Sequence, residues 1–262
     1  MVKLAANLTM MFNEHPFLDR FAAAADAGFT AVEFLFPYDH PVDQIAERLD
    51  RSKLSLALFN LPPGDWNAGE RGMAAVPAQR GAFPGSLALA IDYASILKPS
   101  RLHLMSGHGR RDDREAVAAY RDNIALACAA AAPLGIEIVI EPINGRDMPG
   151  YFLNDFAWAA NLIGEMGLAN LKLQYDIYHR QILHGDVLAS LAALLPIIGH
   201  VQIAAVPHRH EPGTGELDDI GILQQLDALG YRGFVGLEYR PKGDTVMGLV
   251  WRDRLTGMEN TL

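Results

Sequence analysis

The chain has 262 residues, a length that suits one large domain or two small ones. Half of the residues are hydrophobic, the formal net charge is −9 and Cys128 is the only cysteine, which disfavours nucleic-acid binding, an intrachain disulfide and a thiolate metal site. The sequence shows neither a signal peptide nor a stretch long enough to span a membrane, so we expect a soluble, cytoplasmic protein.

Short apolar runs alternate with longer amphipathic stretches along the whole chain. Eight runs have the composition of buried strands, at residues 4–9, 31–36, 54–60, 101–106, 137–143, 171–177, 200–205 and 234–239. Helical periodicity marks seven stretches, at residues 16–27, 42–52, 85–97, 114–134, 154–166, 186–195 and 218–229. A glycine follows four of these stretches, where helices often end in a left-handed residue: Gly28, Gly135, Gly167 and Gly230.

This alternation predicts an α/β fold, a (β/α)8 barrel in which residues 1–262 form a single domain. An open doubly wound sheet is the main alternative, but no Gly-x-Gly-x-x-Gly motif follows the first strand. The longest loop, residues 61–73, follows the third strand. In a barrel it would lie at the C-terminal mouth, where active sites are found.

Each of the last four predicted strands carries an oxygen-bearing side chain near its carboxyl end: Glu141, Asp176, Gln202 and Glu238. Burying a bare carboxylate is costly unless it is paired or bound to a metal. Carboxylate and amide oxygens suit hard divalent cations, so the sequence predicts a site for Mg²⁺ or Mn²⁺ with these four residues as ligands.

Such a site suggests a reaction at an α-hydroxycarbonyl group. A bound cation would polarise the carbonyl and stabilise an enediolate. Glu141 and Glu238 come from well-separated strands, so they can flank the substrate and move a proton between adjacent carbons. Asp176 and Gln202 would then be mainly metal ligands.

Four further residues are candidate substrate contacts. His179 follows Asp176 by three positions and can donate a hydrogen bond to an oxygen that becomes anionic. Arg209, after the seventh strand, can bind a carboxylate in a forked geometry. Trp66 and Arg71 lie in the long third loop and can cover a bound substrate.

Taken in order, segments 6–12, 32–38, 64–72, 141–144, 174–179, 199–204, 210–216 and 236–239 resemble the hydroxypyruvate isomerase family of the xylose-isomerase-like TIM barrels. The resemblance implies interconversion of hydroxypyruvate and tartronate semialdehyde, a small hydroxy-oxo acid. It implies that Glu141 and Glu238 are the acid/base pair and that both also bind the metal with Asp176 and Gln202. It further implies that His179 and Arg209 contact substrate oxygens.

Other functions remain open on the sequence. Segments 6–12 and 56–60 also resemble the sister 2-oxo-tetronate isomerases, whereas residues 141–144 and 175–179 favour the hydroxypyruvate side. A metal-dependent endonuclease-like hydrolase and a non-catalytic sugar-acid-binding protein are alternatives of other classes. We expect no nucleic-acid or membrane partner, and homo-oligomerisation stays open.

Overall fold

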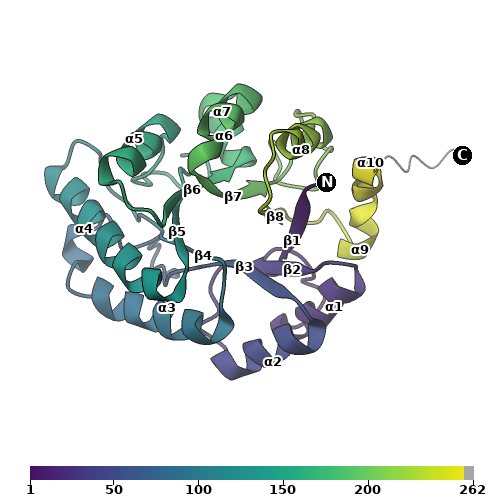
Figure 1. The fold of residues 1–262 in the computed structure, drawn as a ribbon, viewed down its shortest axis with the longest axis horizontal. Coiled ribbons are helices and arrows are strands. Elements are labelled where there is room, and N and C mark those ends of the chain that lie inside the picture. The colour runs from purple at the N-terminus through teal and green to yellow at the C-terminus, as the bar shows by residue number, and fades with distance from the viewer. Residues whose placement is uncertain (257–262) are drawn as a thin grey trace, which may run out of the picture.

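Eight parallel strands pair in chain order and close into a barrel, because β8 pairs with β1 (Figure 1). The computed structural model describes residues 1–256. The strands are β1 (Lys3–Asn7), β2 (Ala31–Phe34), β3 (Ser55–Asn60), β4 (Arg101–His103), β5 (Glu137–Ile140), β6 (Leu171–Asp176), β7 (Ile198–Ile203) and β8 (Phe234–Leu237). The predicted single-domain (β/α)8 barrel is therefore confirmed.

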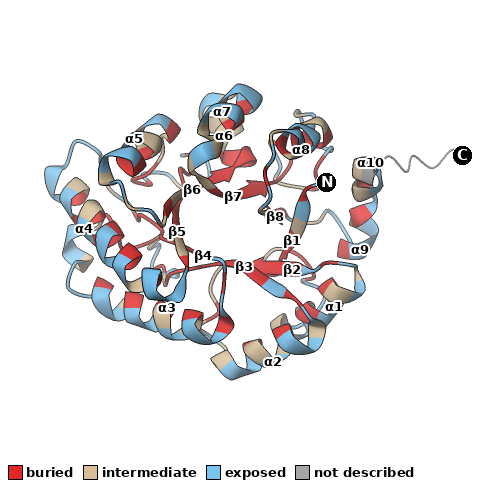
Figure 2. Ribbon diagram, viewed as in Figure 1, coloured by how far each residue is buried: buried red, intermediate tan, exposed pale blue. Residues whose placement is uncertain are grey.

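A ring of helices surrounds the barrel (Figure 1). The helices are α1 (Arg20–Asp26), α2 (Val42–Ser52), α3 (Phe83–Leu97), α4 (Arg114–Ala131), α5 (Phe156–Met166), α6 (Ile177–His184), α7 (Val187–Leu194), α8 (Asp219–Ala228), α9 (Thr245–Gly248) and α10 (Asp253–Thr256). Their apolar faces and the strands make the core, so the strands are largely buried and the outer helix faces are exposed (Figure 2).

Several elements differ from the predicted ranges for local reasons. The predicted helix 114–134 ends as α4 at Ala131 and continues as a 3-10 turn, Ala132–Leu134, since Pro133 has no backbone N–H to continue the α-helix. The first strand ends at Asn7 instead of residue 9, because the Asn7 side chain accepts a hydrogen bond from the Thr9 backbone N–H at 3.1 Å and turns the chain.

Helix α6 was missed because it follows β6 without a loop. Its first residues continue the apolar run of the strand, so the sequence suggested a strand over 171–177. The Asp176 carboxylate accepts a hydrogen bond from the Tyr178 backbone N–H at 2.8 Å and caps the helix. The same residue therefore ends a strand, starts a helix and keeps its other oxygen for the barrel mouth.

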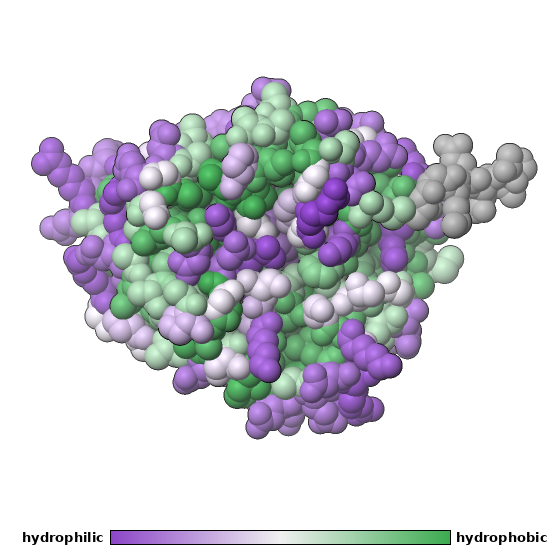
Figure 3. All heavy atoms as spheres, in the orientation of Figure 1, coloured by the Kyte–Doolittle hydropathy of each residue, from purple (hydrophilic) through white to green (hydrophobic). Residues whose placement is uncertain are grey.

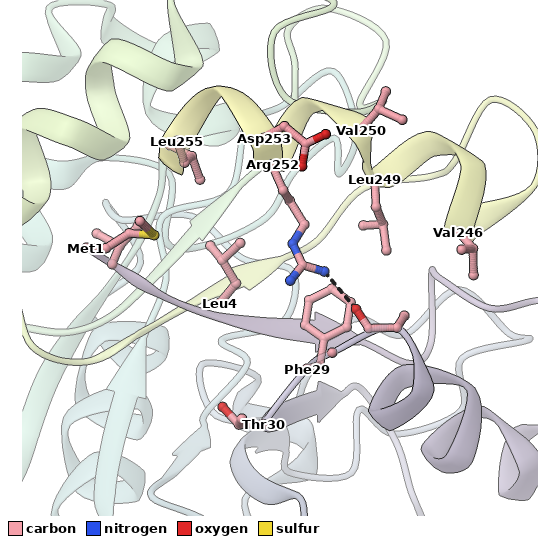
Figure 4. Close-up of a pocket in the computed structure, with 13 residues that line it drawn as sticks. Met1, Leu4, Phe29, Thr30, Val246, Leu249, Val250, Arg252, Asp253 and Leu255 are labelled. Carbon is pink, nitrogen blue, oxygen red and sulfur yellow. Dashed lines mark hydrogen bonds between the residues drawn. The ribbon is translucent and has the colours of Figure 1, made fainter. Parts of the chain in front are cut away.

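The C-terminal helices α9 and α10 lie beside β1 and α1 in the ring that surrounds the barrel (Figure 1). There, a cavity of about 470 Å³ lies between the start of β1, the turn after α1 and the segment from α9 to α10 (Figure 4). Arg252 crosses this cavity, donates a hydrogen bond to the Ala27 backbone oxygen at 3.0 Å and lies 4.7 Å above the Phe29 ring. These contacts tie the segment from α9 to α10 to the turn after α1.

The surface mixes hydrophilic and hydrophobic residues, with hydrophilic ones prominent around the periphery (Figure 3). Among the described helices, none is long and apolar enough to cross a membrane.

Candidate active site

A cavity of about 820 Å³ opens at the carboxyl ends of the strands. It is lined by six of the residues that the sequence singled out: Trp66, Arg71, Glu141, His179, Arg209 and Glu238. The other two, Asp176 and Gln202, lie deeper and are almost completely buried. The closed barrel thus brings together residues that are up to 172 positions apart.

Three buried carboxylates form the centre of the site. Glu141 follows β5, Asp176 ends β6 and Glu238 follows β8. Burial, and next the neighbouring Glu238 and Asp176, raises the pKa of Glu141 well above its usual value. Burial raises the pKa of Asp176 to about 6 and that of Glu238 to about 8, although Arg209 opposes both shifts. The carboxyl groups therefore keep protons more readily than exposed ones do, because full ionisation of all three would leave negative charge that Arg209 alone does not balance.

Arg209 is the cation that the protein itself supplies. Its Nη2 lies 2.5 Å from Glu238 Oε2 and 3.3 Å from Asp176 Oδ2, and its guanidinium stacks 4.9 Å from the Tyr178 ring. Burial alone would lower the pKa of Arg209, but the carboxylates raise it, so the guanidinium stays charged. Arg209 therefore neutralises part of the cluster and faces the cavity.

The hydrogen bonds of Asn144 determine which ring nitrogen of His179 carries the proton. The Asn144 side-chain oxygen accepts hydrogen bonds from the backbone N–H groups of Arg146 and Asp147, at 2.9 and 3.0 Å, which turns its NH₂ group toward His179. This NH₂ group lies 2.6 Å from His179 Nδ1, and the Asn144 backbone N–H also donates to Nδ1 at 3.4 Å. Nδ1 is thus an acceptor.

Burial, and next Arg209, lowers the pKa of His179 well below its usual value, so the ring is neutral. A neutral ring with Nδ1 as acceptor carries its proton on Nε2. Nε2 lies 3.5 Å from Asp176 Oδ2 and 3.9 Å from Glu141 Oε1. It can donate a hydrogen bond to a substrate oxygen near these carboxylates.

The sequence did not single out His103. It ends β4, is buried, lines the cavity, and its Nε2 lies 3.6 Å from Glu141 Oε2 without a hydrogen-bond partner. Burial, and next His200, lowers the pKa of His103 to about 3, so it is a neutral polar group. A single histidine in an apolar strand has no distinguishing sequence pattern; the approach to Glu141 is visible only in the closed barrel.

The loop after β3 covers one side of the cavity. The Arg71 guanidinium stacks 3.8 Å from the Trp66 ring and donates through Nη1 to the backbone oxygens of Trp66 and Glu70. Trp66 in turn contacts Phe36, with ring centroids 5.3 Å apart. The loop therefore presents a positive charge and an aromatic surface to the site.

The donor set fits a divalent cation. Ligand atoms of Glu141, Asp176 and His179 lie within 4.8 Å of one another, and Glu141 Oε1 is buried without a hydrogen-bond partner. When ionised, the three carboxylates and the Arg209 guanidinium leave two negative charges, which a divalent cation would balance. Because His179 turns its N–H to the cluster, the oxygens are the better ligands.

Gln202 lies beside this cluster on β7, where it is the register partner of Asp176. Its amide NH₂ donates to Glu33, and its oxygen accepts from Gln174 at 2.6 Å. A role of Gln202 as a ligand stays a prediction.

Residues 21–255 match the model of the xylose isomerase-like TIM barrel family. The chain is 51% identical to a 2-oxo-tetronate isomerase from Cupriavidus necator, over 96% of this chain and 97% of that protein. It is 40% identical to a hydroxypyruvate isomerase from Escherichia coli, over 97% of this chain and 99% of that protein. A crystal structure described as an AP endonuclease, family 2, from Brucella melitensis superposes with a TM-score of 0.94 at 45% sequence identity. The match covers 97% of this chain and 99% of that chain. The chain therefore belongs to the xylose isomerase-like TIM barrel family, in the group of the hydroxypyruvate and 2-oxo-tetronate isomerases, and is an isomerase.

Proposed function

We propose that the chain isomerises a short hydroxy-oxo acid by moving a proton between adjacent carbons. The observation that carries this proposal is the set of buried carboxylates Glu141, Asp176 and Glu238 beside the neutral His179 at the floor of the cavity. The two candidate substrates are 2-oxo-tetronate and hydroxypyruvate. The higher identity to a 2-oxo-tetronate isomerase favours the four-carbon acid, whereas residues 141–144 and 175–179 favour hydroxypyruvate.

Glu141 and Glu238 are the proposed acid/base pair. With hydroxypyruvate, one member of this pair removes a proton from carbon 3 as a carboxylate. The other member, as a carboxylic acid, delivers a proton to carbon 2. The proton of the carbon 3 hydroxyl moves to the oxygen on carbon 2, so an aldehyde forms where the alcohol stood. Because the two residues follow strands three places apart in the ring, they can reach different sides of the substrate.

The other side chains bind and orient the substrate. His179 Nε2–H donates a hydrogen bond to the oxygen that becomes anionic, and the neutral ring does so without giving up a full proton. Arg209 and Arg71 are cations that can hold the substrate carboxylate, and Trp66 excludes water from one side.

A divalent cation, Mg²⁺ or Mn²⁺, would be held by Glu141, Asp176, Gln202 and Glu238. When bound, it would polarise the substrate carbonyl and stabilise the negative charge of the enediolate. An endonuclease-like hydrolase is less favoured, since the net charge of −9 opposes binding to a phosphate backbone.

The test is a paired assay of Mn²⁺-loaded protein with hydroxypyruvate and with 2-oxo-tetronate, in which NMR follows formation of the isomer. We expect turnover of at least one substrate and its loss in excess EDTA; the faster substrate identifies the preferred acid. Turnover of neither substrate would overturn the proposal. The same assay in D₂O reports whether the transferred proton exchanges with solvent.

A further inference from the structure

A buried polar network crosses the interior of the barrel below the candidate active site. Its centre is Glu33 on β2, a carboxylate with no exposed surface. Glu33 Oε1 accepts hydrogen bonds from Asn7 Nδ2 at 3.0 Å and from Gln202 Nε2 at 2.8 Å, and Oε2 lies 2.6 Å from His200 Nε2. None of these contacts belongs to the proposed proton transfer.

A glycine makes room for this arrangement. Gly236 on β8 is the register partner of Gln202, and a Cβ atom at this position would lie 2.2 Å from Glu33 Oε2. Any other residue would therefore displace the carboxylate. The absence of a side chain at Gly236 lets Glu33 reach from β2 past β1 and β8 to the side chains of β7.

The Glu33 carboxylate decides which end of the Gln202 amide faces the site. Glu33 Oε1 is the acceptor of two amide NH₂ groups, those of Asn7 and Gln202, so Gln202 turns its NH₂ group toward Glu33. Its carbonyl oxygen then points the other way, to Gln174 Nε2 at 2.6 Å. The Gln174 side chain also interacts with the Glu141 carboxylate, so the carbonyl oxygen of Gln202 lies on the side of the carboxylate cluster.

We propose that Glu33 is a positioning residue that holds the Gln202 carbonyl oxygen toward the carboxylate cluster, where that oxygen can serve as a metal ligand. The inference rests on the proposed function, because it assumes a cation at this cluster. A carbonyl oxygen has two lone pairs, so it can accept from Gln174 and still bind a cation. With the amide reversed, the NH₂ group would face the cation and repel it. Partners that orient a ligand in this way commonly change metal affinity by about 10- to 100-fold when they are removed.

The test measures the Kd of Mn²⁺ for the metal-free full chain by isothermal titration calorimetry, with melting curves to confirm folding. Glu33→Met keeps the length of the side chain but removes the acceptor, and we expect it to weaken Mn²⁺ binding by at least about 10-fold. Glu33→Gln keeps a carbonyl oxygen as acceptor and should stay within about 3-fold of the wild type. Asn7→Ala is the matched control, because it removes a different donor from the same oxygen of Glu33 and should leave Mn²⁺ binding close to the wild type.

The outcomes separate this role from the proposed function. A wild-type chain that binds no Mn²⁺ overturns the metal site itself. If the wild-type chain binds Mn²⁺ and Glu33→Met binds it no more weakly than Asn7→Ala does, only the positioning role is overturned. If Glu33→Met does not fold, Gly236→Ala displaces the same carboxylate from β8 and is expected to weaken Mn²⁺ binding in the same direction; unchanged affinity in a folded Gly236→Ala chain would contradict the inference.

Discussion

At the scale of single residues, the candidate active site depends on a few side chains whose protonation is set by burial. Burial raises the pKa values of Glu141 and Glu238, so they hold protons more tightly than exposed carboxylates do. Burial lowers the pKa of His179, so its ring is neutral. A proton-transfer site needs groups of this kind, since an acid or base works best with a pKa near the working pH.

Glu141→Gln and Glu238→Gln should each lower kcat by about 10²- to 10⁴-fold, because an amide cannot accept or deliver the transferred proton. NMR detection of the isomer gives the rate, and circular dichroism confirms the fold. Glu137→Gln is the matched control: Glu137 is also on β5 but pairs with Arg101 at 3.0 Å, outside the cavity, so its kcat should be unchanged. If Glu141→Gln or Glu238→Gln kept the kcat of the wild type, the substituted residue would not belong to the acid/base pair.

Asn144→Asp tests the tautomer of His179. A carboxylate at this position cannot donate to Nδ1, so a neutral His179 ring would move its proton to Nδ1 and lose the N–H that faces the substrate. Loss of such a donor costs about 10²- to 10³-fold in kcat. The loss should grow with rising pH, because the doubly protonated ring keeps the Nε2–H at low pH. A pH profile of kcat parallel to that of the wild type would argue against this arrangement; ¹⁵N NMR of His179 reports the tautomer directly.

At the scale of elements, loops at the carboxyl ends of the strands are the candidate binding elements, and the helices around the barrel stabilise the fold. The loop after β3 places Trp66 and Arg71 against the cavity, and the segment from α9 to α10 packs beside β1 and the turn after α1. Changes in these two regions should therefore separate substrate binding from stability.

Arg71→Ala should raise KM by about 10-fold with a smaller effect on kcat, since a hydrogen bond to a charged group contributes about 1.5–3 kcal/mol. Steady-state kinetics with the preferred acid measures both constants. Arg80→Ala is a suitable control, because Arg80 is in the same connection but pairs with Asp122 on the exposed surface. An unchanged KM for Arg71→Ala would exclude Arg71 from substrate binding.

Arg252→Ala should lower the free energy of unfolding by about 1–2 kcal/mol and leave kcat and KM unchanged. The variant loses the hydrogen bond to the Ala27 oxygen and the contact with the Phe29 ring, each of which contributes about 1 kcal/mol. Urea denaturation measures the change. The comparison is Arg232→Ala, an exposed arginine, for which we expect less than about 0.5 kcal/mol. An equal effect in both variants would mean that Arg252 does not anchor the C-terminal segment.

At the scale of the whole molecule, stability and metal binding are linked through the buried carboxylates. In the metal-free chain the pKa of Asp176 is about 6 and that of Glu238 about 8, above the usual 3.8 and 4.5. Between the usual and the raised values the folded chain binds more protons than the unfolded chain, so these groups make the free energy of unfolding fall as pH rises. Metal binding requires the ionised forms and therefore competes with these protons.

We accordingly expect Mn²⁺ affinity to rise with pH from about pH 6 through about pH 8, as Asp176 and Glu238 ionise, and the raised pKa of Glu141 adds to this rise. Titration calorimetry in EDTA-treated, dialysed protein measures the affinity. In the metal-free state, Glu238→Gln should lose part of the fall in melting temperature between about pH 5 and about pH 8, because the amide does not ionise. An Mn²⁺ affinity that does not depend on pH would contradict a site made of these carboxylates.

The sequence by itself determined the barrel and the position of most candidate site residues. Eight apolar runs separated by helical stretches specify a parallel barrel, and the carboxyl ends of its strands meet at one mouth. Carboxylates at those ends, such as Glu141 and Asp176, could therefore be placed near one another before any contact was known. This prediction is local, because it needs only the hydrophobic periodicity of each segment and the residue at which each strand ends.

Only the tertiary structure decided which groups pair inside the barrel. Arg209 contacts Asp176 across 33 positions, and Glu33 contacts Gln202 across 169. Strands such as those of Glu33 and His103 look like ordinary core strands with one polar residue, since nothing in their own segments reveals the partner. Hydrogen-bond partners, amide orientation and the tautomer of His179 depend on distances between strands, and these distances are fixed only when the barrel closes.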